Sequence, residues 1–142
     1  QKTAYEIYQC DWSSDVCSSD LKDFHIAFGQ RVSETPELPN IEERQLRMRL
    51  LLEEYEEYRN AEYDNDIVEI TDALADLIYI ACGTAVSYGI PLDKVFAEVH
   101  RSNMAKLVDG KPIYREDGKV MKPVGWTAPD IKGVLYKSYF SV

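Results

Sequence analysis

One stretch of the chain, Ile67 to Tyr88, constrains the fold more than any other. It reads IVEITDALADLIYIACGTAVSY and would form a helix that is apolar on almost every side, with its acidic residues confined to the first half. A helix of this kind is normally buried, so other helices must pack around it. Asn65 or Asp66 is suited to cap its start, and Gly89 is suited to end it.

Three further segments have helical signals. Residues 23–29 predict a short helix closed by a glycine. Asn40 predicts the cap of a second helix, which we expect to run from Ile41 to about Ala61. Pro91 predicts the start of a third, over residues 92–106.

The chain after Val108 is rich in Gly, Pro and Lys, and its Asp-Gly turn dipeptides favour a small hairpin or an ordered loop. The predicted fold class is therefore all-α: three main helices plus a short N-terminal helix, with a loop or hairpin as C-terminal tail. We expect residues 22–108 to form the helical domain and residues 109–142 to pack on it.

Three main helices make a thin bundle for one chain. We therefore expect a homodimer or a higher homo-oligomer, in which Tyr79, Ile80 and Val86 pack against a second copy.

Residues 10–21, CDWSSDVCSSDL, interrupt the pattern with Ser, Asp and Cys and show no helical or strand period. The string resembles a translated sequencing-adapter remnant, and the alternative is a disordered acidic leader. We therefore expect residues 1–21 to be non-native or disordered and to lie outside the functional domain.

Composition excludes several classes of protein. A net charge of -9 argues against a broad surface for nucleic-acid polymers, which needs clustered Lys and Arg. No apolar stretch is long enough to span a bilayer, so no membrane partner is expected. Three Cys without metal-ligand spacing predict free thiols and, with these features, a cytoplasmic protein.

Two acidic stripes carry the functional argument. Glu54 and Glu57 share one helix face with Glu53, and Glu69 shares a face of the next helix with Asp72 and Asp76. A short turn joins the helices, so the stripes can face each other. Like charges that converge repel unless a cation lies between them, and an oxygen-only set suits Mg²⁺, with Mn²⁺ possible. The alternative is two solvated helix faces.

The ordered pattern Glu53-Glu54-Tyr55-Glu56-Glu57, Glu69-Ile70-Thr71-Asp72 and the downstream HRSNMAKL resembles MazG-like nucleoside triphosphate pyrophosphohydrolases of the all-α superfamily. The resemblance covers most of residues 23–131. It implies a helical, usually dimeric enzyme that cleaves a (d)NTP to a (d)NMP and pyrophosphate with Mg²⁺.

The resemblance also implies roles for individual residues. The implied metal ligands are Glu54, Glu57, Glu69 and Asp72. Glu53 is implied as the catalytic base or a further ligand, and Asp76 lies one turn beyond the ligands. For contacts with the substrate, we predict Asn103, Lys106, Lys119 and Lys122. The two histidines, His25 and His100, are expected to be structural.

Three alternatives stay open. The first is a phosphoribosyl-ATP pyrophosphohydrolase, a related enzyme that would use the same kind of carboxylate metal site. The second is a ferritin-like di-metal protein, although the Glu-x-x-His pairs typical of that class are absent from the sequence. The third is a non-enzymatic helical interaction module. The residues do not specify the nucleotide, and house-cleaning or dUTP removal both suit the pattern.

Overall fold

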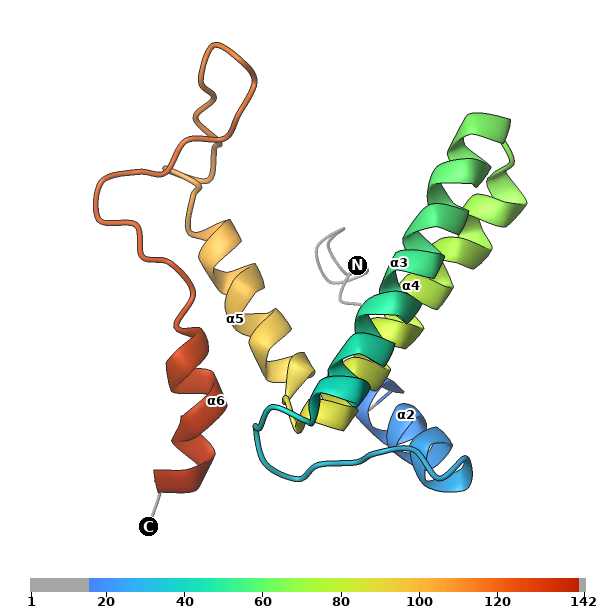
Figure 1. The fold of residues 1–142 in the computed structure, drawn as a ribbon. Coiled ribbons are helices and arrows are strands. Elements are labelled where there is room, and N and C mark those ends of the chain that lie inside the picture. Colours follow the sequence, from blue (N-terminus) through green and yellow to red (C-terminus); the bar gives the residue numbers. More distant parts are fainter. Residues whose placement is uncertain (1–15, 141–142) are drawn as a thin grey trace, which may run out of the picture. The chain divides into compact units, whose positions relative to one another are not determined.

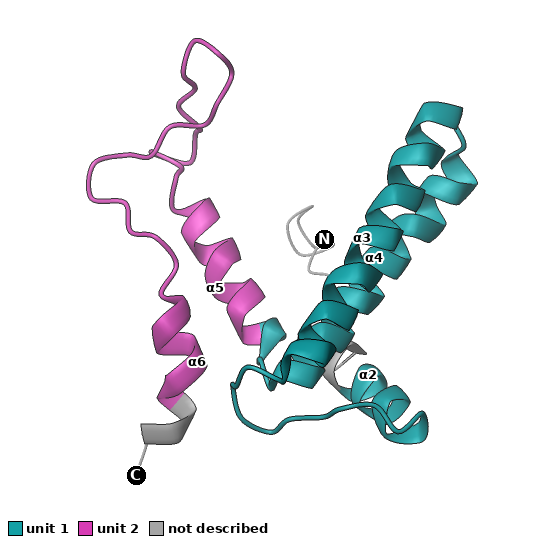
Figure 2. Cartoon of the chain, in the orientation of Figure 1, with its two compact units in different colours: residues 1–93 teal, residues 94–142 magenta. Residues whose placement is uncertain are grey.

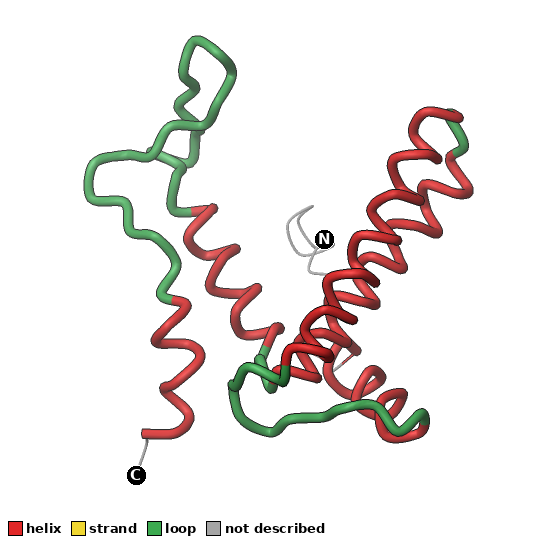
Figure 3. The backbone as a smooth tube through the Cα atoms, viewed as in Figure 1, coloured by secondary structure: helices red, strands yellow, loops and turns green. Residues whose placement is uncertain are grey.

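The computed structural model describes residues 16–140, and side chains from residue 19 to residue 137. Its helices are α2 (Val16–Ala27), α3 (Ile41–Asp64), α4 (Ile67–Tyr88), α5 (Leu92–Met104) and α6 (Ile131–Phe140). Over this range the chain forms helices and loops and no named strand, which confirms the all-α prediction (Figures 1 and 3). The chain divides into two compact units, residues 1–93 and residues 94–142, each described by itself below (Figure 2).

Helices α3 and α4 form a long antiparallel hairpin in the first unit (Figure 1). The Asn40 side chain caps α3 by accepting a hydrogen bond from the backbone N–H of Glu43. At the turn, Asn65 adopts the left-handed conformation with φ 53°, and Asp66 caps α4. Helix α4 has the predicted bounds, because its cap and the left-handed Gly89 were both visible in the sequence. Helix α3 runs to Asp64, one turn beyond the prediction.

The apolar core lies where α2 packs against the C-terminal half of α4. Its buried members are Leu21, Cys82 and Val86, with Val32 and Leu92 packed against them. Val86 is therefore a core residue of its own chain, and the expectation that it contacts a second copy is wrong. Cys82 is disulfide-bonded, so the expectation of three free thiols is also wrong.

Helix α2 begins at Val16, within the segment predicted to be a leader, and Leu21 is 4% exposed. The rest of that segment, residues 1–15, lies outside the described residues. The predicted division into residues 22–108 and 109–142 stays a prediction.

In the second unit, the predicted hairpin or loop contains two isolated antiparallel bridges, Val108 with Lys111 and Tyr114 with Val120. Helix α6 follows, and the sequence reasoning missed it. Its signal was Asp130, whose carboxylate accepts a hydrogen bond from the N–H of Gly133, three residues on, at 2.9 Å.

No single helix in the described part of the chain is long and apolar enough to cross a membrane; α4 and α5 reach that length and composition only as a bent pair.

Candidate active site in the α3–α4 hairpin

Glu54 is the centre of the acidic group in the hairpin. One of its carboxylate oxygens, Oε2, is buried and has no hydrogen-bond partner. Burial raises the pKa of Glu54, and the charges of Asp76, Glu57, Glu53 and Asp72 raise it further, in that order. Glu54 lies on α3 with Glu53 and Glu57, and the other two carboxylates, Asp72 and Asp76, lie on α4. Carboxylates from both helices therefore repel one another.

Glu69 and Asp72 also line a second feature, an open hollow of about 610 Å³ at the start of α4. Its other lining residues are Ile67, Val68, Thr71 and Ala75. Glu69 is exposed and is absent from the charges that raise the pKa of Glu54. The charges of four of the predicted acidic side chains therefore act on Glu54, whereas Glu69 lines this hollow.

The donor chemistry around Glu54 suits a hard divalent cation. All the groups are carboxylates, and a buried oxygen without a donor among mutually repelling charges is costly unless a positive charge compensates. Among the described residues, no group of three or more Asp, Glu, His or Cys side chains lies close enough together to hold a metal ion by itself. Mg²⁺ tolerates such a partial set, because it keeps several waters and takes oxygens from substrate phosphates.

A family model described as phosphoribosyl-ATP pyrophosphohydrolase matches residues 21–103, more than half of the chain and all of the hairpin. The chain belongs to the phosphoribosyl-ATP pyrophosphohydrolase family. This family lies within the all-α nucleoside triphosphate pyrophosphatase superfamily. A comparison with curated proteins found no match.

Membership in the phosphoribosyl-ATP pyrophosphohydrolase family makes the chain a hydrolase that acts on acid anhydrides. The matching family is the one given above as the first alternative, and the match does not separate it from the MazG-like branch. The ferritin-like and non-enzymatic alternatives are not retained.

The predicted substrate contacts all lie in the second unit, at or beyond the end of the family match. Lys106 donates a hydrogen bond from Nζ to Oδ1 of Asn103 at 2.8 Å. Lys106 and Lys122 both approach the ring of Trp126. Lys119 is exposed, and the interactions described for it are made by its backbone. Three of the four predicted residues are thus brought together in this unit.

The sequence reasoning missed a buried polar network beside the core. Arg47 is 3% exposed and donates from Nε to Oε1 of Glu43 at 2.9 Å. Ser87 donates to the same oxygen at 2.8 Å. Burial raises the pKa of Glu43, but the hydrogen bonds from Ser87 and Arg47 outweigh it, so the pKa is lowered. The sequence feature that could have predicted this ion pair is the spacing of Glu43 and Arg47, which are four residues apart in a helix.

His25 completes this network and is structural, as expected. It is 1% exposed and donates from Nδ1 to the carbonyl oxygen of Arg31 at 2.7 Å. Gly83 leaves room for it, because a Cβ there would lie 3.0 Å from Nε2 of His25 and 3.4 Å from a guanidinium nitrogen of Arg47. His100, by contrast, is exposed on α5.

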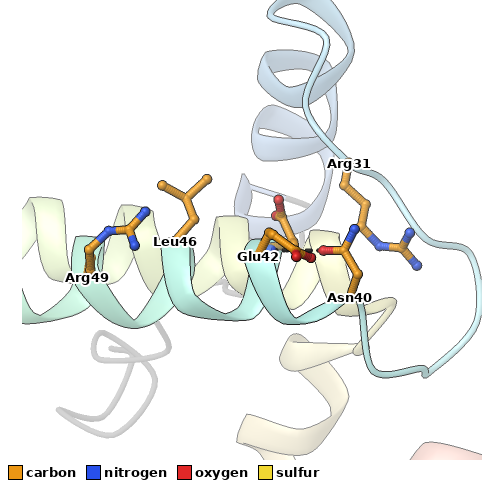
Figure 4. Close-up of a pocket in the computed structure, with 6 residues that line it drawn as sticks. Arg31, Asn40, Glu42, Leu46 and Arg49 are labelled. Carbon is orange, nitrogen blue, oxygen red and sulfur yellow. Dashed lines mark hydrogen bonds between the residues drawn. The ribbon is translucent and has the colours of Figure 1, made fainter.

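A second hollow, of about 480 Å³, lies at the start of α3 (Figure 4). Arg31 reaches it from the preceding loop, and Leu46 and Arg49 project from α3. Arg31 already donates to the carbonyl oxygen of Ser87 and pairs with Glu37, so its charge is engaged. This hollow also has acidic residues in its lining, and we do not assign it a role in hydrolysis.

Proposed function

We propose that the α3–α4 hairpin hydrolyses a nucleoside triphosphate between its α and β phosphates, with Mg²⁺, to a nucleoside monophosphate and pyrophosphate. The observation that carries this proposal is Glu54. A buried carboxylate oxygen without a hydrogen-bond donor, surrounded by four like charges, needs a positive partner. Mg²⁺ with its phosphate ligands supplies such a partner.

In this proposal the carboxylates of the hairpin have different roles. Glu54, Glu57, Glu69 and Asp72 hold the cation, and Asp76 supports Glu54 from one turn further along α4. Glu53 is exposed beside Glu54 and accepts the proton of the attacking water. When bound, Mg²⁺ neutralises charge on the phosphates and lowers the pKa of a bound water.

Pyrophosphate release tests this proposal. The substrates are standard and modified nucleoside triphosphates, including dUTP, each assayed with Mg²⁺, with Mn²⁺ and with EDTA. We expect turnover with the metal ions and none with EDTA. We expect Glu54→Gln and Asp72→Asn each to abolish hydrolysis while far-ultraviolet circular dichroism stays unchanged.

Glu56→Gln is the matched control. Glu56 belongs to the same acidic run, but it is exposed and is not among the charges that act on Glu54. We expect it to retain activity. Turnover at the wild-type rate in either Glu54→Gln or Asp72→Asn would defeat the assignment.

Phosphoribosyl-ATP is the second candidate substrate, and the family match favours it. It presents the same triphosphate to the metal site but carries a second ribose phosphate on the base. Adding it to the same panel separates the two candidates. A value of kcat/KM at least tenfold above that for every nucleoside triphosphate would select phosphoribosyl-ATP.

We also propose that a second copy of the chain completes the bundle. Met48, Leu52 and Tyr55 follow one face of α3 and are 59%, 55% and 50% exposed. Leu74 and Ile78 follow one face of α4 and are 46% and 48% exposed. Apolar stripes of this extent favour burial against a partner. Sedimentation equilibrium should give at least twice the chain mass of 16.3 kDa, and a monomer at micromolar concentration would exclude this arrangement.

A further inference from the structure

The charge of the chain is divided very unevenly between its two units. Residues 1–93 contain 7 Lys and Arg against 20 Asp and Glu, a net charge of -13. Residues 94–142 contain 9 against 5, a net charge of +4. A polyanion that approaches without a metal ion is repelled by the first unit and attracted by the second.

Within the second unit, both arginines are paired with carboxylates, whereas two lysines contact an aromatic ring instead. Arg101 pairs with Glu98, and Arg115 pairs with Asp117. Lys106 and Lys122 form no ion pair with a carboxylate anywhere in the described range of the chain.

Instead, the two ammonium groups gather on one aromatic ring. The Nζ atom of Lys122 lies 4.5 Å from the centroid of the Trp126 ring, and that of Lys106 lies 5.8 Å from it. A cation–π contact of this kind attracts each ammonium but neutralises neither. Both positive charges therefore stay beside the same ring and remain available to an anion.

The ring itself is firmly held. The indole Nε1 of Trp126 donates to the carbonyl oxygen of Ser102 at 2.8 Å. Ser102 is 1% exposed, and its hydroxyl donates to the carbonyl oxygen of Thr127 at 3.1 Å. On the other side, the amide oxygen of Asn103 holds the ammonium of Lys106. Both lysines are thus positioned before any ligand binds, which lowers the entropy lost on binding.

We propose that Lys106 and Lys122, held on Trp126, form a binding site for a pyrophosphate group. This group is either free pyrophosphate or part of the polyphosphate of a nucleotide. Binding of a nucleotide here rests on the proposed function, whereas binding of free pyrophosphate does not. Two ammonium groups held on one ring can each form a charge-assisted hydrogen bond with one of two linked phosphates. A nucleobase is a poorer occupant, because lysine ammonium groups already approach the ring.

Fluorescence of Trp126 in the full chain tests the proposal. The chain has two tryptophans, so Trp12→Phe leaves Trp126 as the only reporter. Sodium pyrophosphate is titrated in EDTA, which keeps the carboxylate site out of the measurement. A non-hydrolysable α,β-methylene nucleoside triphosphate is titrated in parallel and distinguishes the nucleotide from the free product.

We expect a saturable change in fluorescence with pyrophosphate. Lys106→Met and Lys122→Met should each weaken binding by about tenfold or more, since each removes one charge-assisted contact. Lys132→Met is the control, because it removes an equal charge from an exposed position on α6. Lys122→Arg keeps the charge and should keep most of the affinity, which separates loss of charge from loss of folding.

Pyrophosphate affinity that is equal in the wild type, both methionine variants and the control would overturn the site, as would no binding by the wild type. If the affinity for the methylene analogue falls in the lysine variants, the nucleotide is a ligand of this site. If only the affinity for pyrophosphate falls, the ligand is the free product. Glu54→Gln separates the two proposals: it should lose hydrolysis and keep pyrophosphate binding. Hydrolysis that persists when this site fails its test leaves the proposed function standing.

Discussion

Replacing Glu54 by glutamine should stabilise the metal-free protein while it abolishes hydrolysis. The substitution keeps the shape of the side chain and removes one negative charge from a group of five. An amide can also donate a hydrogen bond to the neighbouring carboxylates, where Glu54 can only repel them.

The magnitude can be worked from the neighbours of Glu54. Four like charges act on it, and at about 0.2–0.5 kcal/mol for each pair their removal is worth about 1–2 kcal/mol. Relief of the unpartnered buried oxygen adds about 1 kcal/mol. Salt screens the exposed members, so the expected gain is about 1–3 kcal/mol, with the lower end at physiological ionic strength.

Urea denaturation in EDTA measures this gain. With a slope of about 2 kcal/mol per molar urea, the midpoint should rise by about 0.5–1.5 M. At physiological ionic strength, where the expected gain is about 1 kcal/mol, saturating Mg²⁺ should reverse the order, because a ligand at a hundred times its Kd stabilises the wild type by about 2.7 kcal/mol and stabilises the variant less. Glu56→Gln should leave the midpoint within about 0.25 M, as expected for an exposed substitution.

The same reasoning predicts a pH dependence. Burial, followed by the neighbouring charges, raises the pKa of Glu54 above its ordinary value of 4.5. A carboxyl with a raised folded-state pKa contributes stability that is fully present below the unfolded pKa and is lost as the pH rises through the folded pKa. The advantage of Glu54→Gln in EDTA should therefore be small below pH 4.5 and should widen above it. A variant that is less stable than the wild type at pH 7 in EDTA would refute this account of the site.

Three further predictions concern the fold and its buried charges. Arg47→Met should lower the free energy of unfolding by about 3 kcal/mol, because it leaves Glu43 partly buried without its cation, and urea denaturation measures this loss. Glu43 has a lowered pKa, so its stabilising contribution is present above its unfolded pKa and lost on acidification; Glu43→Gln should flatten the acid limb of the stability curve. Gly89→Ala should cost about 2–4 kcal/mol, because φ is +68° and a Cβ would lie 2.1 Å from the carbonyl oxygen of Thr35; Gly110→Ala, at φ +74° in open space, should cost about 1 kcal/mol by the same assay.

Local signals in the sequence were enough to predict the hairpin. Asp66 and Gly89 bracket α4 with side-chain and backbone chemistry that acts within one turn, so both bounds were correct. The spacing of the acidic residues likewise determined which of them share a helix face, because helical geometry repeats every 3.6 residues. The missed helix α6 had a comparable cap at Asp130 but lay in a tail whose glycines and prolines favoured loops.

Spacing does not tell which member of a shared face is covered by the neighbouring helix. The acidic run Glu53–Glu57 gives no local reason for Glu54 to be the member with a buried oxygen; the contact between α3 and α4 decides this. In the same way, Arg47 is buried because the fold places it beside Gly83 of α4 and within hydrogen-bond distance of Gln30, which follows α2. Lys106 and Lys122 are 16 residues apart in the sequence, and only the tertiary structure brings both to Trp126. Whether a side chain is buried, and which side chains it contacts, depends on elements that are distant in the chain. The local sequence around a residue therefore does not predict them.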